Sequence, residues 1–359
     1  MKIVQMLPCF AYGDAIGNET VAIDNMLKEE GYETAIYAES CDEKMRASGL
    51  ANEIREDLSF SNNDIILFHL AISNWWNKKV LDFGAKVIYI YHNVTPAKYF
   101  SGPYNPYWIA VQKGIMDVKY LANKVKYCIA DSEFNRSELI SYGYNCDIRV
   151  IPLLIPFEDY KQKPSEEIVQ KYSDYEGTKI LFTGRVAPNK KHEDIIAVFY
   201  EYKKHIDPKA RLFLVGSYNP DDKYYKSLKQ YASELDCEDD VIFTGHIRFD
   251  EILAYYTVSD CFLCLSEHEG FCVPLVEAMC FDMPVIAYDS CAVKGTLGGA
   301  GFLLDKKNPL ETAFVINRIL EDKVLKDTII SNQRERLKDF DYKVIKRQLL
   351  EFLKGVISG

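Results

Sequence analysis

The sequence predicts an α/β protein with two parallel-sheet halves, and three observations support this. Short apolar runs alternate with helical stretches along most of the 359 residues. The alternation stops at residues 152–177, which carry three prolines and no strong strand pattern, and then resumes. A chain of this length is also too long for one compact core. We therefore expect two domains joined by a linker.

The first half is expected to form a βαβ unit with a mostly parallel sheet. Its strands are predicted at residues 2–7, 34–38, 64–70, 86–91, 127–130 and 148–151. Helices are predicted between them at residues 19–30, 111–124 and 135–141. Asp131 or Ser132 is expected to cap the last of these helices.

The second half repeats the alternation and ends in a helix-rich tail. Strands are predicted at residues 179–183, 211–215, 241–244, 260–265, 284–288 and 301–304. Helices are predicted at residues 193–205, 223–235, 250–258 and 274–280, and the tail runs from residue 309 to about residue 358. The pattern predicts two Rossmann-like domains that face an interdomain cleft, where such pairs of domains bind ligands.

Composition excludes some classes of function. The net charge of −10 argues against nonspecific nucleic-acid binding. Ten cysteines at irregular spacings, with no signal peptide before the first strand, indicate reduced thiols in the cytoplasm. Cys261 and Cys264 form a Cys-x-x-Cys pair, but on a strand they point to opposite faces, so core packing is favoured over a metal or redox role. No apolar run is long enough to span a bilayer.

The most informative stretch is residues 266–279, which joins a predicted strand to a predicted helix. It carries Glu269 and Glu277 on either side of a glycine–aromatic–proline turn. Open α/β sheets bind ligands at the carboxyl ends of their strands. The amides at the helix start, apart from that of Pro274, could hold phosphate or sugar oxygens. The residues expected to contact the ligand there are Gly270, Phe271, Cys272, Val273 and Leu275.

A basic loop after the strand at residues 179–183 complements these carboxylates. Gly184 allows close backbone approach, and Arg185 and Lys190 place two cations beside a helix N-terminus. A diphosphate is the expected guest, and the alternative is a solvated loop with two surface cations. Glu269 would then hold sugar hydroxyls and stabilise an oxocarbenium-like transition state. Glu277 would accept the ribose hydroxyls, or it is only a favourable first-turn acid.

The N-terminal half offers candidates after its first strand. The loop at residues 12–18 contains Gly13 and Gly17, where the backbone approaches a ligand. Asp14 contacts an acceptor or caps the following helix, and the two interpretations are equally supported.

Two histidines and an asparagine end later strands of that half. His92, at a strand's carboxyl edge, is expected to bond a sugar hydroxyl in preference to acting as a general base, and Asn93 beside it is an acceptor-side candidate. His69 is interpreted as a satisfied core histidine. In the other half, His268 lines the site or packs beside Glu269.

Together these motifs resemble the family 4 retaining glycosyltransferases, which have the GT-B fold. The resemblance covers most of the chain and is strongest over residues 179–304, with a narrower likeness to enzymes of bacterial surface-polysaccharide synthesis. It implies an N-terminal acceptor-side domain at residues 1–160, a C-terminal nucleotide-sugar domain at 161–340, and a final helix at 341–359 that returns to the N-terminal domain. Where many relatives carry a Pro-Glu pair, this chain has Val293-Lys294-Gly295-Thr296.

The resemblance also implies roles for single residues. Arg185 and Lys190 would bind the donor diphosphate, Glu269 the sugar, Glu277 the ribose, and His92 would touch the sugar. The base would lie near Gly216 and Ile247. No metal or cofactor is expected, and the only Asp-x-Asp, at residues 339–341, lies far from these motifs.

The predicted function is therefore transfer of a hexose, with retention, from GDP-mannose or a UDP-hexose to a hydroxyl. The expected acceptor is a glycan or a lipid-linked oligosaccharide, and the expected location is the cytoplasm. Peripheral contact with the inner membrane face is left open, with Trp75, Trp76 and nearby lysines as candidates. The alternatives are a nucleotide-sugar epimerase, a phosphorylase and an inactive partner subunit that only binds nucleotide.

Overall fold

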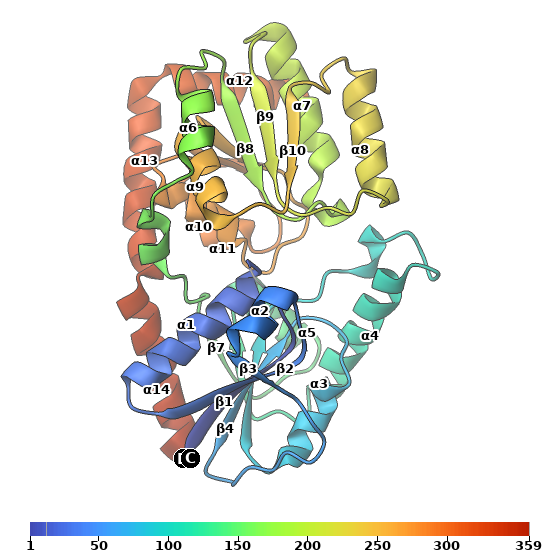
Figure 1. Cartoon of the computed structure of the whole chain (residues 1–359), viewed down its shortest axis with the longest axis vertical. Helices are drawn as coiled ribbons and strands as arrows, with labels where there is room; N and C mark the ends of the chain where they lie inside the picture. Colours follow the sequence, from blue (N-terminus) through green and yellow to red (C-terminus); the bar gives the residue numbers. More distant parts are fainter. Residues whose placement is uncertain (12, 359) are drawn as a thin grey trace. The chain divides into compact units, whose positions relative to one another are not determined.

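The computed structural model describes residues 1–11 and 13–358, and it divides into two compact units. Unit 1 comprises Met1–Pro156 and Phe340–Gly359, and unit 2 comprises Phe157–Asp339 (Figure 1). Tyr12, in the predicted ligand loop, and Gly359 lie outside the described residues. The chain thus passes from unit 1 to unit 2 inside the segment predicted as a linker.

Unit 1 is built on a parallel sheet of seven strands, in the order β3-β2-β1-β4-β5-β6-β7. The six predicted strands are confirmed. The additional strand, β3, has only three residues and pairs at the edge, so it carries no apolar run to reveal it. The strands are β1 (Lys2–Phe10), β2 (Glu33–Cys41), β3 (Ala51–Glu53), β4 (Ile65–Leu70), β5 (Lys86–Tyr91), β6 (Tyr127–Ala130) and β7 (Asp147–Val150).

Helices cover both faces of this sheet (Figure 1). The three predicted helices are confirmed, and Ser132 rather than Asp131 caps the last, with its Oγ accepting from the Asn135 amide at 3.1 Å. Two short helices, α2 and α3, escaped prediction because they have too few turns for a periodic pattern. The helices are α1 (Ala15–Glu29), α2 (Glu43–Ser48), α3 (Trp76–Lys79), α4 (Pro106–Leu121) and α5 (Glu133–Ser141).

The C-terminal helix α14 (Tyr342–Ser358) belongs to unit 1, which confirms its predicted return to the N-terminal half. Its apolar face packs with α1 and the sheet around Ile3, Met26 and Leu27. The buried residues of α14 recur at helical spacing: Ile345, Leu349, Phe352, Leu353 and Val356. This helix completes the core of unit 1.

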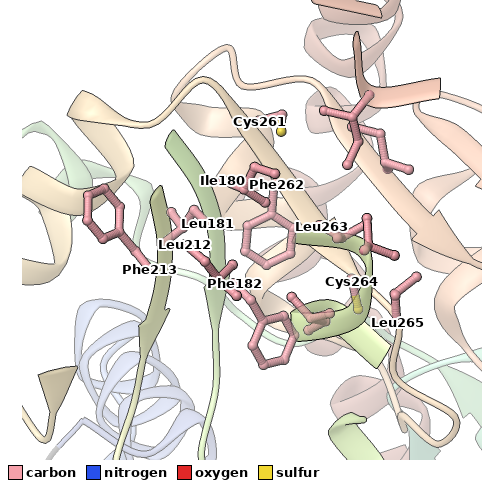
Figure 2. Close-up of a cluster of buried hydrophobic side chains, with 14 of the residues drawn as sticks. Ile180, Leu181, Phe182, Leu212, Phe213, Cys261, Phe262, Leu263, Cys264 and Leu265 are labelled. Atoms are coloured by element: carbon pink, nitrogen blue, oxygen red, sulfur yellow. The ribbon is translucent and has the colours of Figure 1, made fainter. Parts of the chain in front are cut away.

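Unit 2 contains a second parallel sheet, in the order β10-β9-β8-β11-β12-β13. All six predicted strands are confirmed. They are β8 (Lys179–Thr183), β9 (Arg211–Val215), β10 (Val241–Gly245), β11 (Cys261–Cys264), β12 (Val285–Tyr288) and β13 (Phe302–Leu304). Side chains from β8, β9 and β11 meet in one continuous core, including Leu181, Phe213 and Phe262 (Figure 2).

The helices of unit 2 correct one prediction. The segment predicted as a linker contains α6 (Glu166–Ser173), which packs on α9, and the Ser165 amide donates to the Asp250 carbonyl at 2.8 Å. α6 has only eight residues, fewer than the window of about 11–18 residues over which helical periodicity is recognised in a sequence. The other helices are α7 (His192–His205), α8 (Lys223–Glu234), α9 (Phe249–Val258), α10 (Val273–Cys280), α11 (Val293–Leu297), α12 (Pro309–Glu321) and α13 (Lys323–Leu337).

Candidate functional site

The strand order of unit 2 places the candidate site at a topological switch point. The chain leaves β8 toward β9 and β10 on one side, and returns to β11 on the other. The loops after β8 and β11 therefore begin at the carboxyl ends of two adjacent strands whose connections run in opposite directions, which is where α/β folds bind ligands. These loops are the predicted basic loop and the predicted carboxylate run.

Lys190 and Glu269 meet at this switch point although they lie 79 residues apart in the sequence. Nζ of Lys190 lies 2.7 Å from Oε1 and 2.6 Å from Oε2 of Glu269. The side chains are 21% and 7% exposed. Burial disfavours the ammonium ion, but Glu269 outweighs it, so the pKa of Lys190 is raised. The predicted diphosphate and sugar residues thus form one ion pair.

Asn189 fixes these two loops to each other. Its side-chain amide donates to the His268 carbonyl at 3.0 Å, and its carbonyl accepts from the Glu267 amide at 2.8 Å. Both bonds are buried in the described structure around Asn189, which is 6% exposed. Lys191 has another role, because its Nζ contacts Glu193 at 3.1 Å and Glu267 at 3.7 Å. Of the two adjacent lysines, only Lys190 is aimed at Glu269.

Arg185 and two glycines complete the basic side of the site. Arg185 is exposed and makes no ion pair within residues 1–11 and 13–358, so its charge is available to an anion. Gly184 has a φ of 148°, and a Cβ on Gly216 would lie 2.1 Å from the Gly184 carbonyl oxygen. The ends of β8 and β9 thus touch backbone to backbone. Ile247, in the loop after β10, is half-buried and packs on the core.

Glu277 has protein partners that the sequence did not reveal. The hydroxyl of Tyr160 donates to Oε1 and that of Tyr256 to Oε2, both at 2.7 Å. Tyr256 also bonds Oγ1 of Thr183, at 2.6 Å. Burial raises the pKa of the Glu277 carboxyl, and the tyrosine hydrogen bonds only partly offset this. Each carboxylate oxygen keeps a lone pair that can accept a further hydrogen bond. The two tyrosines therefore leave room for a ribose, and ribose binding by Glu277 stays a prediction.

The start of α10 shows which predicted amides are available. The Leu275 amide donates to the Cys272 carbonyl at 3.1 Å, so the predicted ligand contact of this amide would require that bond to break. Cys272 and Val273 occupy the N-cap and first positions of α10, where amides lack intrahelical acceptors. Gly270 and Phe271 precede them in the same turn, and the Phe271 carbonyl accepts from Thr296 Oγ1 at 2.5 Å. Of the predicted contacts, the amides of Cys272 and Val273 are therefore the ones whose position in the helix suits a ligand.

His192, directly behind the basic loop, is a buried histidine without polar partners for its ring. Neither ring nitrogen has a hydrogen-bond partner in the described residues, and the residue is fully buried. The ring packs edge-on against Phe182, with centroids 5.1 Å apart. Burial, and then the charge of Lys190, lowers the pKa of His192 to about 3. His192 is therefore a neutral core ring.

In unit 1, His92 belongs to a buried polar chain. Nδ1 of His92 lies 2.9 Å from Oδ2 of Asp131, and Nε2 lies 2.8 Å from Nδ1 of His69. His69 in turn bonds Oε1 of Gln5 at 3.1 Å, so the interpretation of His69 as a satisfied core histidine is confirmed. The His92 side chain is 3% exposed. A sugar contact by His92 stays a prediction, and it would require Nε2 to release His69.

The protonation of the histidines in this buried polar network is set by burial and by two neighbouring acids, Asp131 and Glu19. Burial opposes the charged imidazole, but Asp131 and Glu19 outweigh it and raise the pKa of His92 to about 9. Burial also raises the pKa of Glu19 to about 7. A protonated His92 then donates to Asp131 and to His69, which stays neutral because burial and His92 lower its pKa well below the usual value.

The remaining N-terminal candidates divide into exposed and structural residues. Asp14 is exposed at the N-cap of α1, but its side chain makes no capping hydrogen bond. Asn93 is buried and donates to Asn135 and Glu138, each at 2.9 Å, so its amide nitrogen is engaged in the fold. A Cβ on Gly17 would lie 2.6 Å from the Ala11 carbonyl oxygen, and Gly13 has a φ of 74°. Backbone geometry alone accounts for both glycines.

Two family models match the chain. Residues 164–336 match the model described as "Glycosyl transferases group 1", and residues 26–158 match "Glycosyltransferase Family 4". The matched ranges contain the switch-point loops of unit 2 and, in unit 1, His69, His92 and Asp131. The chain belongs to the family 4 glycosyltransferases.

Curated relatives of this family 4 glycosyltransferase act on several sugars. It is 28% identical over 257 residues to alpha-monoglucosyldiacylglycerol synthase of Streptococcus pneumoniae, an alignment that covers 68% of this chain and 54% of the relative. It is 22% identical over 237 residues to a GDP-mannose-dependent phosphatidylinositol monomannoside mannosyltransferase of Mycobacterium tuberculosis, covering 62% of this chain and 60% of the relative. The chain therefore spans little more than half the length of these relatives.

Solved structures support the GT-B fold of this glycosyltransferase. HepE of Anabaena, in complex with UDP and glucose, superposes with a TM-score of 0.77 at 20% identity, covering 99% of this chain and 100% of HepE. Sucrose-phosphate synthase of Thermosynechococcus elongatus gives a TM-score of 0.77 at 18% identity, with complete coverage of both chains. At these identities the likeness establishes the fold. None of the helices in the described ranges has the length and apolar character of a transmembrane span.

Sequence reasoning missed several polar residues of this glycosyltransferase's candidate site. Tyr160 and Tyr256 belong to segments with no ligand motif, and Asn189 looked like an ordinary loop residue. Asp131 had been assigned only as a possible cap. One signal could have found Tyr256, because a tyrosine on an otherwise apolar helix face needs a buried partner for its hydroxyl.

Proposed function

We propose that the chain transfers a hexose from a nucleotide-diphosphate sugar to a hydroxyl, with retention of the anomeric configuration. The observation that carries the proposal is the Lys190–Glu269 ion pair, together with Arg185 of the same basic loop, which is exposed and makes no ion pair within the described residues. Two cations and one carboxylate at a switch point suit a ligand that is anionic on one side of the breaking bond and becomes cationic on the other.

In the proposed reaction, the bond from the sugar's anomeric carbon to the diphosphate oxygen breaks as the bond to the acceptor oxygen forms. The acceptor's proton passes to the leaving phosphate oxygen on the same face, so no enzyme nucleophile is needed. Arg185 and Lys190 stabilise the charge on the departing diphosphate, which is electrostatic catalysis. Glu269 stays beside the sugar, holding a hydroxyl and stabilising the oxocarbenium character.

The Lys190–Glu269 pair prepares the site for this step. Because Asn189 fixes the two loops, Lys190 is held at the site before the donor arrives. An ammonium ion has three donor hydrogens, so it can bind a phosphate oxygen while it keeps Glu269. Preorganised charge of this kind needs little rearrangement at the moment of reaction.

Glucose and mannose donors are the first to test. Relatives are named as glucosyl- and mannosyltransferases, and HepE was crystallised with UDP-glucose. We propose a UDP-hexose or GDP-mannose as donor and a glycan or lipid-linked oligosaccharide as acceptor, in the synthesis of a cell-surface polysaccharide. The proposed location is the cytoplasm, and the reaction as written takes no metal ion or cofactor.

The helix α4 supports a proposed contact with a membrane surface. Its exposed apolar side chains include Tyr107, Ile109, Met116 and Tyr120. Nζ of Lys124 lies 4.7 Å from the centroid of the Tyr120 ring. Aromatic and basic side chains together suit the interface of anionic lipids. Trp75, the other predicted membrane candidate, is 65% exposed, whereas Trp76 is only 7% exposed and packs in the core.

The proposed reaction is tested by assaying purified wild type, Glu269→Ala and Lys190→Ala with a panel of nucleotide sugars. Each variant is expected to lose most transfer activity while its circular-dichroism spectrum stays native. Lys191→Ala is the matched control, because this neighbouring cation pairs with Glu193 and Glu267 instead, and it should retain most activity. Near-normal turnover by either site variant would overturn the assignment.

The rival functions are distinguished by leaving out the acceptor. An epimerase would convert a nucleotide sugar alone, whereas the proposed transferase would only hydrolyse it slowly. An inactive partner subunit would bind nucleotide and transfer no sugar to any acceptor. Transfer in the presence of excess EDTA would support the metal-independent mechanism, and the anomeric proton couplings of the product would report retention or inversion.

A further inference from the structure

Three buried side chains beside the Lys190–Glu269 pair form a cluster of metal-binding groups. The thiol–carboxylate cluster consists of Cys264, Cys272 and Glu269, whose ligand atoms all lie within 4.8 Å of one another. The two Sγ atoms are 4.0 Å apart. Exposures are 0%, 6% and 6%, so the cluster is shielded from solvent. The proposed transfer reaction uses Glu269 and neither thiol.

The fold brings together one thiol from the strand before the carboxylate run and one from the turn within that run. Cys264 is the last residue of β11, and it lies among the buried side chains of the unit 2 core (Figure 2). Cys272 is the N-cap of α10. Cys261, the other half of the Cys-x-x-Cys pair, is fully buried elsewhere in the core, so Cys272 and not Cys261 is the partner of Cys264.

Cys272 stands in a backbone conformation that suits glycine better than cysteine. Its φ of 74° and ψ of 66° lie in the left-handed region. A side chain other than glycine costs about 1 kcal/mol or more in that region. Strained residues of this kind concentrate at functional sites.

The donor set selects the kind of ion. Zn²⁺ binds thiolates at about 2.3 Å in a tetrahedron, which places two sulfur ligands about 3.8 Å apart. The observed separation of 4.0 Å needs little adjustment. Mg²⁺ and Ca²⁺ prefer sets made only of oxygen ligands, so two thiols and one carboxylate disfavour them. Three protein ligands leave a fourth position for water or a phosphate oxygen.

We propose that Cys264, Cys272 and Glu269 bind a soft divalent cation, with Zn²⁺ as the physiological class and Cd²⁺ as its probe. Binding releases the two thiol protons, because thiolates are the ligands. It also draws the Glu269 carboxylate away from Lys190, so the occupied site opposes donor binding. The binding claim stands on the cluster alone, whereas the inhibition claim rests on the proposed function.

The binding claim is tested by titrating the full chain with Cd²⁺. The protein is first stripped with EDTA, dialysed under a phosphine reductant, and its free thiols are counted. One equivalent of Cd²⁺ is expected to produce the ultraviolet thiolate-to-cadmium band of two thiolates, and competition with a chelator gives the affinity for Zn²⁺.

Substitutions of the two cluster cysteines test whether each thiol is a ligand. Cys264→Ser and Cys272→Gly are each expected to weaken Cd²⁺ affinity at least about 100-fold, because the loss of a residue that only supports a ligand already costs about 10- to 100-fold. Cys272→Gly keeps the fold, because glycine suits the left-handed backbone. Cys261→Ser is the matched control and should bind as wild type does. No band in wild type, or an equal band in Cys272→Gly, would overturn the site.

The inhibition claim has its own measurement. Zn²⁺ should inhibit wild-type transfer and EDTA should restore it, whereas Cys264→Ser, which changes no residue assigned to donor binding, should resist inhibition. Equal inhibition of the two proteins would overturn this claim. If wild type transfers no sugar at all, the Cd²⁺ titration still decides the binding claim, so failure of the proposed function is distinguished from failure of the site.

Discussion

Tyr256 donates its hydroxyl hydrogen to Oε2 of Glu277 across 2.7 Å, and Tyr160 does the same to Oε1. The carboxylate is thereby fixed in rotation before any ligand binds. A fixed, partly buried carboxylate is well suited to recognise a ribose, and it also serves the packing of α9 and α10. The first prediction separates these two roles.

Glu277 is expected to bind the ribose hydroxyls of the donor nucleotide. Removing one ribose hydroxyl from the nucleotide should weaken binding to wild type about 10- to 100-fold, the range for a hydrogen bond to a charged group. Glu277→Ala should not distinguish the deoxynucleotide from the parent nucleotide in isothermal titration calorimetry. Tyr256→Phe, the control, keeps the carboxylate and should keep the discrimination. If Glu277→Ala still discriminates, the role of Glu277 is structural.

Acid should destabilise the wild type through His192. Its pKa is lowered to about 3 in the fold, so the folded state excludes a proton that the unfolded chain binds below about pH 6.5. The resulting stability is present above pH 6.5 and is lost as the pH falls toward 3, by up to about 4 kcal/mol. His192→Phe should remove this loss, as measured by urea unfolding across that pH range. An unchanged pH dependence would show that another group titrates.

Alkaline pH should weaken unit 1 through His92. Its pKa is raised to about 9, so its contribution is complete below about pH 6.5 and is lost as the pH rises through 9. The loss is about 3 kcal/mol. Asp131→Asn removes the acid that outweighs burial, so it should lower the His92 pKa and flatten this dependence. Nitrogen-15 NMR of the imidazole rings reports the pKa directly, and a His92 pKa that stays high would contradict the prediction.

The contact between Gly216 and Gly184 should not tolerate a side chain. A Cβ on residue 216 would lie 2.1 Å from a backbone oxygen, where no side-chain rotation can relieve the clash. Gly216→Ala should therefore lower the free energy of unfolding by several kcal/mol and weaken nucleotide binding. Gly355→Ala is the control, because it lies in α14 with open space around it, and it should stabilise by about 0.5–1 kcal/mol. Similar effects of the two substitutions on unfolding would refute the argument.

The sequence by itself determined every strand of the two units except β3. Buried parallel strands are short apolar runs, and that signal is local, as at residues 86–91 and 179–183. Because the signal is local, it also explains why two short elements were not predicted. The edge strand β3 has only three residues and α6 has only eight, so neither is long enough to show a periodic pattern.

The sequence also determined which residue types meet at the candidate site, because strand ends in α/β sheets carry ligand-binding groups. Only the tertiary structure decided which of them touch. Lys190 reaches Glu269 because β8 lies beside β11, and this strand order is a nonlocal choice that no short window of sequence encodes. The partners of Glu277, His92 and Cys272 were decided in the same way, since packing between distant segments sets side-chain contacts.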